Sequence, residues 1–287
     1  MTASPGWPAA EIACRTLLAR GFCRADRLAK SPRAAVYRVT LLDGPGPPTA
    51  IIKLYAGSNR WKATREHQVL TRLAVMEQFG VPTVLGAGAV PGVDVTALAL
   101  TDLGTSTLGD AVVEGVLAQA QALKELGRLL ACFHRFSQEP NFESPLATQV
   151  LDLQRRLPAE IHDATARAFR SVIGLSHGRS AVWCHGDLHL NNVLLAPDPH
   201  LIDFEQVGHN LPEYDLAQTA VTTGALTPAE RAPIVEGYHR HVCDELLSGL
   251  IVFQAVRGWW WSAVQERRDI ELWEDRLKLV LAHGAPT

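Results

Sequence analysis

The chain has 287 residues, of which 47% are hydrophobic and 20% charged, and its formal net charge is −3. Without an excess of basic residues, a nucleic-acid backbone or an anionic membrane is not expected as the main partner, and no feature calls for an obligate protein partner. The five cysteines are an odd number with no Cys-x-x-Cys pair, which favours reduced thiols and a cytoplasmic location. A secretory leader is not expected, because no basic stretch precedes an apolar run near the first residue, and no membrane span is expected, because no apolar run reaches the roughly 20 residues required.

The first third of the chain shows the patterns of β-strands around one long helix. Alternating segments rich in β-forming residues predict strands, and turn residues such as those of Pro91-Gly92 separate them. A long segment with apolar positions near the 3.6-residue spacing predicts a helix. The predicted strands are 35–42, 49–55, 83–89 and 94–100, and the predicted helix is 59–78.

After residue 100 the pattern changes from strands to helices. Residues 101–107 are polar and contain glycine, so we predict a hinge there between an N-terminal lobe, 1–100, and a C-terminal lobe, 108–287. The expected fold is α+β, with a small antiparallel sheet and one long helix in the first lobe and mostly helices in the second. Helical patterns cover 116–136, 148–157, 158–173, 228–242 and 244–281, the last interrupted near Gly258 or at 266–269.

One non-helical segment, 181–203, interrupts the helical region and concentrates polar residues between short apolar strands. It contains the octapeptide His-Gly-Asp-Leu-His-Leu-Asn-Asn at 185–192, and Asp203 follows at the end of the next strand. Phosphoryl transfer needs a carboxylate at the attacking hydroxyl, and an amide oxygen with a second carboxylate to hold Mg²⁺. Asp187, Asn192 and Asp203 supply that set. The alternative is a polar hairpin in which these side chains only satisfy loop backbone groups.

The pattern His-Gly-Asp-Leu-His-x-x-Asn-Val-Leu, followed by Ile-Asp-Phe-Glu, resembles the catalytic core of the aminoglycoside phosphotransferase and choline kinase group. These enzymes are small-molecule relatives of the protein kinases, so the resemblance implies a bilobal protein-kinase-like fold that uses ATP or GTP with Mg²⁺. It implies that Asp187 is the catalytic carboxylate and that Asn192 and Asp203 are the metal ligands. By the same resemblance, His185 holds the loop in place, and Asp215, in a Tyr-Asp-Leu-Ala sequence, caps it.

Two residues upstream bear on the resemblance independently. Such kinases have a strand lysine that contacts nucleotide phosphates and a helix glutamate that holds it. Lys53 lies in an apolar strand, where an unpaired ammonium is costly, so a partner is expected. We prefer Glu66 as that partner and expect Lys53 to face an accessible cleft. The alternative is that Glu66 is a solvated carboxylate beside Lys62, four residues earlier.

The remaining nucleotide contacts have weaker signals. The turn at 31–35 contains no glycine, so Ser31 either contacts phosphate or belongs to an exposed turn. The segment 98–104 falls where such kinases join their lobes and bind adenine through main-chain groups. There the resemblance implies the backbone of Thr101 and Leu103, and the alternative is a plain linker.

Two residues besides Asp187 are considered for the acceptor side. Glu205 is the best acidic candidate, because it closely follows Asp203. Consecutive indoles at 259–261 point about 100° apart on a helix, so either they pack between helices or one of them, taken as Trp260, stacks on a sugar or a cation. His134, at the end of a helical pattern, is expected to be a core or helix-terminal histidine.

The function expected from these residues is transfer of the γ-phosphoryl group to a hydroxyl of a small molecule. By resemblance alone the acceptor is an aminoglycoside, another antibiotic or an aminosugar, which implies antibiotic resistance. Only about a dozen residues separate Asp203 from the next helix, too few for the peptide platform of a protein kinase. A protein kinase and a non-catalytic nucleotide-binding regulatory module remain the alternatives.

Overall fold

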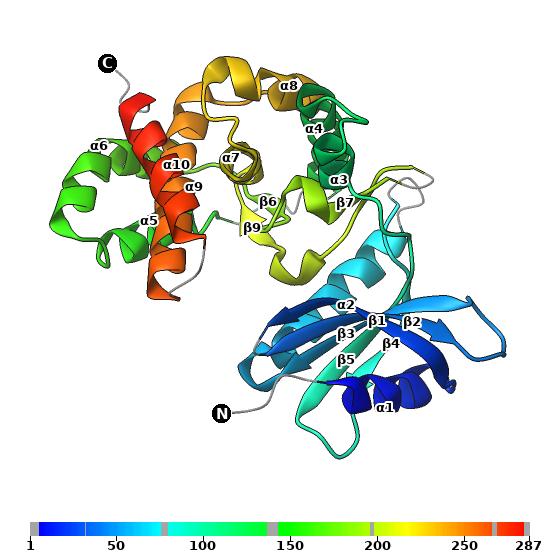
Figure 1. The fold of residues 1–287 in the computed structure, drawn as a ribbon. Helices are drawn as coiled ribbons and strands as arrows, with labels where there is room; N and C mark the ends of the chain where they lie inside the picture. The colour runs from blue at the N-terminus through cyan, green and yellow to red at the C-terminus, as the bar shows by residue number, and fades with distance from the viewer. Residues whose placement is uncertain are drawn as a thin grey trace. The chain divides into compact units, whose positions relative to one another are not determined.

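The computed structural model describes residues 6–31, 33–75, 80–136, 143–195, 198–265 and 269–283. The chain forms two compact units, whose elements are labelled in Figure 1. Unit 1 comprises Met1–Ser106 and Leu194–Val207, and unit 2 comprises Thr107–Val193 and Gly208–Thr287. Within the described ranges, none of the helices combines the length and the apolar character needed to cross a membrane.

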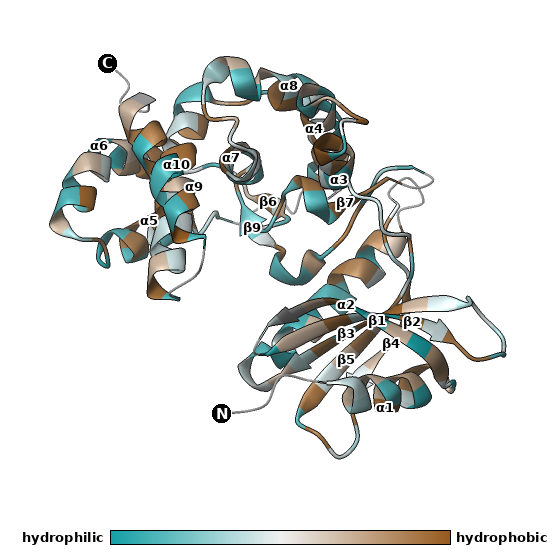
Figure 2. Cartoon of the chain, viewed as in Figure 1, coloured by the Kyte–Doolittle hydropathy of each residue, from teal (hydrophilic) through white to brown (hydrophobic). Residues whose placement is uncertain are grey.

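Unit 1 is a five-stranded antiparallel sheet with a helix on each face, in the strand order β1-β2-β3-β5-β4 (Figure 1). Because successive side chains of a strand point to opposite faces, Ile52 and Leu54 of β3 join the apolar core beneath helix α1, whereas Lys53 faces helix α2. In Figure 2 the strands in the middle of this sheet are mostly brown, the colour of hydrophobic residues. The elements are α1 (Trp7–Leu18), β1 (Phe22–Ser31), β2 (Ala34–Leu41), β3 (Thr49–Ala56), η1 (Gly57–Asn59), α2 (Arg60–Ala74), β4 (Val84–Ala89) and β5 (Val95–Thr101).

The four predicted strands of the first third are present, and the predicted helix corresponds to α2. Residues 76–78 of that predicted helix lie outside the described part of the chain. The sequence patterns predict neither α1 nor β1. The buried positions of α1 are alanines and Cys14, which give little hydrophobic contrast, and β1 carries several charged residues and two shifts of register against β2.

Unit 2 is mostly helical, and its helices pack chiefly as α4 with α8 and as α6, α7 and α10 around α9. Glycines allow the closest of these approaches: a Cβ at Gly237 would lie 1.9 Å from the carbonyl oxygen of Lys124 in α4. The helices are α3 (Leu108–Val113), α4 (Gln119–Phe136), α5 (Leu146–Gln154), α6 (Ala159–Ser176), α7 (Pro212–Thr223), α8 (Pro228–Tyr238), α9 (Asp244–Val264) and α10 (Ile270–His283).

Short strands and turns frame the polar segment. Strand β6 (Val182–Cys184) pairs with β9 (Gly208–Asn210), and β7 (Val193–Leu194) pairs with β8 (His200–Leu201). The turn η2 (Leu190–Asn192) ends the loop, and the turn η3 (Phe204–Gln206) follows Asp203.

Within the predicted 244–281 helix, α9 ends at Val264 and α10 begins at Ile270, and the helix continues through Gly258. Residues 266–268 of the alternative break at 266–269 lie outside the described part of the chain. Gly258 lies inside α9, where a Cβ would be 2.1 Å from the Trp273 ring, so the glycine permits α10 to pack closely. The predicted α+β fold, with a small antiparallel-sheet unit and a larger helical unit, is confirmed.

Candidate active site

The first part of the site, in unit 1, is an ammonium group held between two carboxylates. Lys53 Nζ donates to Glu66 Oε1 and to Asp203 Oδ1, both at 2.7 Å. Lys53 is 7% exposed and Glu66 1%, and the Tyr55 hydroxyl donates to the other oxygen of Glu66. The predicted pairing of Lys53 with Glu66 is therefore present. Lys62, the alternative neighbour of Glu66, bonds elsewhere.

The Lys53 ammonium and the carboxylates of Glu66 and Asp203 stabilise one another in their charged forms. Burial lowers the pKa of Lys53, but the carboxylates of Asp203 and Glu66 outweigh that effect and hold the pKa above its usual range. Burial also raises the pKa of Glu66, although the Lys53 ammonium opposes the rise. The expectation that Lys53 faces an accessible cleft is wrong, because both carboxylates enclose its ammonium group.

The segment around Asp203 is held against α2 by further polar contacts. Asp203 has φ = 69°, in the left-handed region that is uncommon for residues other than glycine, and 34% of its side chain is exposed. Lys62 Nζ donates to Glu205 Oε1 at 2.6 Å, and the Arg65 guanidinium donates to the Val207 carbonyl. Glu205, which the sequence suggests for acceptor binding, thus already has a cationic partner within unit 1.

The second part, in unit 2, is the loop that follows β6, and its backbone is held by Asp215 of α7. The carboxylate of Asp215 accepts hydrogen bonds from the backbone N–H groups of His185 at 2.6 Å and Gly186 at 3.0 Å. The expected capping of the loop by Asp215 is present. His185 is fully buried, and these bonds fix the backbone immediately before Asp187.

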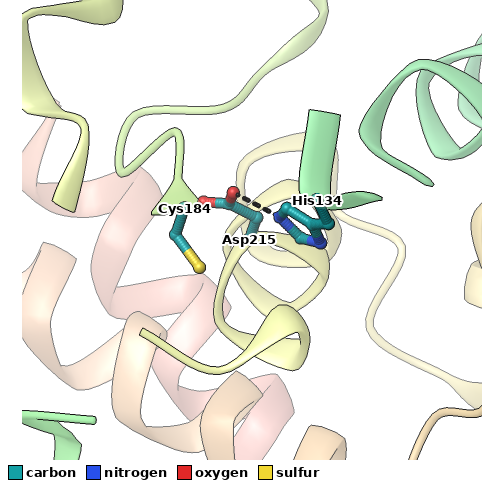
Figure 3. Close-up of side chains that lie close together, drawn as sticks. All are labelled: His134, Cys184 and Asp215. Carbon is teal, nitrogen blue, oxygen red and sulfur yellow. Dashed lines mark hydrogen bonds and ion pairs between the residues drawn. The ribbon is translucent and has the colours of Figure 1, made fainter. Parts of the chain in front are cut away.

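Asp215 also belongs to a buried cluster that the sequence does not indicate. His134 of α4 lies 3.1 Å from the carboxylate through Nε2 and 2.9 Å from the Tyr238 hydroxyl through Nδ1. Figure 3 shows the side chains of His134, Cys184 and Asp215 close together, with the bond between His134 and Asp215 dashed. His134 is therefore a core histidine, one of the two expected roles. No spacing rule links residues 134, 184 and 215, so only the fold shows the grouping.

The cluster has three potential ligand atoms within 4.8 Å of one another, but its chemistry does not favour a metal ion. Burial and the nearby carboxylates of Asp215 and Glu213 raise the pKa of the Cys184 thiol well above its usual value. The thiol donates to the Leu211 carbonyl at 3.2 Å. A metal ion binds the thiolate rather than the thiol, so we interpret the cluster as a hydrogen-bonded core.

Asp187 and Asn192 lie next to each other in the loop. Asn192 is buried, and its Nδ2 donates to the Asp187 carbonyl at 2.7 Å, which leaves the amide oxygen Oδ1 as an acceptor. The carboxylate of Asp187 is only half-buried, and it accepts a long hydrogen bond of 3.4 Å from Gln218 Nε2. Gln218 is one turn beyond Asp215 on α7, and no sequence motif marks it as a functional residue.

The predicted adenine-binding segment is partly committed to internal bonds. The N–H of Thr101, the last residue of β5, donates to the Thr83 carbonyl at 2.9 Å, and Thr101 Oγ1 accepts from the Thr83 N–H at 2.9 Å. This N–H is therefore not available to adenine. Leu103 follows in a turn in which Gly104 N–H donates to Asp102.

Two other predicted residues have ordinary surroundings. Ser31 ends β1 and lies in an exposed turn, where its Oγ accepts from the Arg33 N–H at 3.4 Å. Trp260 is half-buried, and the Arg156 guanidinium lies 5.3 Å from the centre of its ring. The cation that stacks on this indole is therefore one of the chain's own side chains. The binding roles of both residues stay predictions.

The donor set predicted for a metal ion is chemically suitable for Mg²⁺. The Asn192 amide and the Asp203 carboxylate offer oxygen atoms, which Mg²⁺ prefers. Hydrogen bonds hold both side chains in place. Asn192 Nδ2 donates to the Asp187 carbonyl, and Lys53 Nζ donates to Asp203 Oδ1. Asn192 belongs to unit 2 and Asp203 to unit 1.

Comparison with known proteins gives a family and a fold. The model of the phosphotransferase enzyme family matches residues 27–249. An uncharacterized protein of Deinococcus radiodurans is 31% identical over 163 residues, which span 53% of this chain and 46% of the relative. The aligned part thus covers less than half of that curated relative.

Three solved structures with a similar fold are distant from this chain in sequence. The GDP and kanamycin complex of APH(2")-IIia has a TM-score of 0.73 at 16% identity and covers 95% of this chain and 98% of its own. Choline kinase LicA from Streptococcus pneumoniae has a TM-score of 0.70 at 16% identity, covering 97% and 98%. A putative fructosamine-3-kinase from Thermobifida fusca has a TM-score of 0.63 at 17% identity, covering 97% and 99%. The resemblance to the aminoglycoside phosphotransferase and choline kinase group, with its protein-kinase-like fold, is confirmed.

Proposed function

The chain belongs to the phosphotransferase enzyme family, and on that premise we propose that it transfers the γ-phosphoryl group of ATP or GTP to a hydroxyl of a small molecule. The observation that carries the proposal is the contrast between two aspartates of unit 2. Asp215 is fully buried, and its carboxylate accepts hydrogen bonds from the loop backbone. Asp187, which that backbone presents, is half-buried with one long side-chain contact. Such an arrangement supports a carboxylate kept ready for a ligand.

Each residue has a defined task in this reaction. The Asp187 carboxylate accepts the hydrogen bond of the attacking hydroxyl, orients its oxygen toward phosphorus and takes its proton as the new bond to phosphorus forms. The bond between the γ-phosphorus and the bridging oxygen breaks in the same step, and ADP or GDP leaves. Lys53 contacts the nucleotide phosphates, and Glu66 keeps its ammonium group in place. Leu103 contributes main-chain groups to adenine.

Asn192 and Asp203 would hold Mg²⁺ through their side-chain oxygens. A bound Mg²⁺ neutralises phosphate charge. Asp203→Ala should therefore abolish the Mg²⁺-dependent binding of ATP measured by calorimetry, and unchanged affinity would remove Asp203 from this role.

The proposed acceptor is an aminoglycoside, another antibiotic or an aminosugar, and resistance to the antibiotic follows if the acceptor is one. The family and the kanamycin complex of APH(2")-IIia support this class. A small acceptor is also supported by the short stretch between Asp203 and the start of α7 at Pro212, which leaves no room for a peptide platform.

The test is a screen for ADP release with aminoglycosides, other antibiotics, aminosugars and choline-like alcohols, followed by mass spectrometry of each hit. We expect one acceptor class to gain the mass of one phosphoryl group, and Asp187→Asn to abolish that product. Phosphorylation of an added protein instead of any small molecule would overturn the proposal in favour of a protein kinase. Absence of turnover with every acceptor would leave a nucleotide-binding module.

A further inference from the structure

Helix α7 contacts the loop that follows β6 through three polar side chains on one face of the helix. Asp215, Gln218 and Thr219 have the i, i+3, i+4 spacing that places side chains next to one another on a helix. Asp215 accepts from the two backbone N–H groups that precede Asp187. Thr219 Oγ1 donates to the Leu188 carbonyl at 3.5 Å. The helix therefore holds the loop backbone on both sides of Asp187.

Gln218 differs from the other two side chains because it contacts a side chain of the loop and not its backbone. Its Nε2 donates to Asp187 Oδ1 at 3.4 Å. A carboxylate accepts hydrogen bonds through both of its oxygens. A donor on Oδ1 therefore leaves Oδ2 of Asp187 for the attacking hydroxyl of the proposed reaction.

The Gln218 amide lies in an environment that is unfavourable for its oxygen. The side chain is 7% exposed, and among the residues that the structure describes no group donates to the buried Oε1. A buried acceptor without a donor lowers folding stability, because it has lost its hydrogen bonds with water. Rotating the amide by 180° would place Oε1 against the Asp187 carboxylate, where two acceptors repel. An unbranched apolar side chain would fill the same space without this cost, so packing does not explain the amide.

We propose that Gln218 is a positioning residue, whose Nε2 group holds Oδ1 of Asp187 so that Oδ2 points toward the attacking hydroxyl. The inference rests on the proposed function, because it assigns a further residue to the same reaction. A hydrogen bond of 3.4 Å is long and contributes little to stability. A misplacement of about 1 Å at a reacting group, however, can lower a rate about a hundredfold. The effect of Gln218 is therefore expected in kcat and not in the stability of the fold.

The experiment replaces Gln218 and a matched buried glutamine by methionine. Gln218→Met keeps the length of the side chain and removes both the donor and the unpaired oxygen. The control is Gln254→Met on α9. Gln254 is 4% exposed, and its Nε2 also donates over 3.4 Å, but to the backbone carbonyl of Tyr214. The two substitutions remove the same chemical group from similarly buried positions, and the Asp187 carboxylate is the partner in one of them.

Turnover is measured as transfer of a radiolabelled phosphoryl group from ATP to kanamycin and to every other compound that the wild type phosphorylates in the screen. Gln218→Met should lower kcat by at least about tenfold, with an unchanged KM for ATP. Its melting temperature should equal or exceed that of the wild type, because the unpaired oxygen is gone. Gln254→Met should keep the wild-type kcat and melt at a lower temperature. A lower melting temperature of Gln218→Met with an unchanged kcat would show a structural role and overturn the proposal.

A double substitution tests whether Gln218 acts through Asp187. In Asp187→Ala the carboxylate that the amide holds is absent, so adding Gln218→Met should change the residual kcat by less than about twofold. This result would support positioning even if Gln218→Met also lowered the melting temperature. A loss in the double variant equal to the product of the two single losses would overturn the proposal, because Gln218 would then act independently of Asp187.

The outcomes also separate the proposal from the function on which it rests. If an acceptor is phosphorylated and Gln218→Met has the wild-type kcat, the positioning role fails and the phosphotransferase function stands. If the wild type phosphorylates no compound of the screen, the proposed function fails. The positioning role fails with it, because it requires that reaction.

Discussion

Asp187 and Asp215 should respond in opposite ways to the same substitution, aspartate to asparagine. In Asp215→Asn the single remaining oxygen cannot replace both carboxylate oxygens, which accept from His185 N–H, Gly186 N–H and His134 Nε2. At least one buried donor loses its charged partner and faces the new amide NH₂. A hydrogen bond to a charged group contributes about 1.5–3 kcal/mol and an orphaned donor costs about 1–3 kcal/mol, so unfolding free energy should fall by about 3–5 kcal/mol.

In Asp187→Asn the corresponding loss is small, because among the described residues the carboxylate has only a 3.4 Å contact with Gln218 Nε2. Its stability should change by less than about 1 kcal/mol, while kcat should fall at least about a hundredfold because proton transfer and hydroxyl alignment are lost.

The assay is urea unfolding of both variants, followed by tryptophan fluorescence, beside ADP release at saturating substrate. The expected pattern is a shifted midpoint with an unchanged m-value for Asp215→Asn, and an unshifted midpoint with lost turnover for Asp187→Asn. Equal destabilisation by the two substitutions would refute the division into a structural and a catalytic aspartate. Near-native turnover of Asp187→Asn would mean that the loop is a polar hairpin without a catalytic role.

Three further predictions concern buried groups. Lys53→Met should destabilise the protein by about 3–5 kcal/mol, because Glu66 stays buried without its cation, and adding Glu66→Gln should recover part of that loss in urea unfolding. Burial raises the pKa of Cys14 to about 11. The contribution of the buried thiol to folding stability is therefore fully present below pH 9 and is lost as pH rises toward 11. Cys14→Ala should show a smaller fall in melting temperature than the wild type between these pH values, and an identical fall would contradict the prediction. His134→Gln keeps an amide that can replace one ring nitrogen, so it should retain a higher kcat than His134→Leu at equal KM for ATP. The backbone amides of residues 185–187 should exchange hydrogen more slowly in His134→Gln than in His134→Leu. Equal loss of kcat in both variants would show that the histidine only fills space.

The parts of the fold that the sequence predicts are those where burial creates a strong pattern. Lys53 in an apolar strand requires a counter-ion whatever the fold, so its pairing with Glu66 follows from electrostatics and helix position. The buried cluster of His134, Cys184 and Asp215 has no such local cause. Its members come from α4, β6 and α7, and only the packing of these elements brings them together.

The division of the chain into two units is also only partly predictable from the sequence. Composition changes once, near residue 101, and therefore predicts a single division of the chain. Leu194–Val207 nevertheless belongs to the compact unit of the sheet, because Lys62 and Arg65 of α2 bind Glu205 and the Val207 carbonyl. These contacts join residues more than 140 positions apart. The polar face of α2 is indistinguishable in the sequence from a solvent-exposed face, so it does not predict these distant partners.

The charge of the unit 1 group has a consequence for nucleotide binding. Lys53 carries one positive charge, whereas Glu66 and Asp203 together carry two negative charges, so the hydrogen-bonded group has a net charge of −1. Nucleotide phosphates are anionic and are repelled by such a group in a buried environment, where charges are weakly screened. We therefore expect nucleotide binding to require a cation in addition to Lys53, which is the physical reason to expect dependence on Mg²⁺. Asp203→Asn removes one negative charge and should bind ATP more tightly than the wild type in the presence of a chelator, while losing the gain that Mg²⁺ gives. Calorimetry with and without Mg²⁺ measures both quantities, and equal metal-free affinity in the two proteins would show that the carboxylate does not oppose the phosphates.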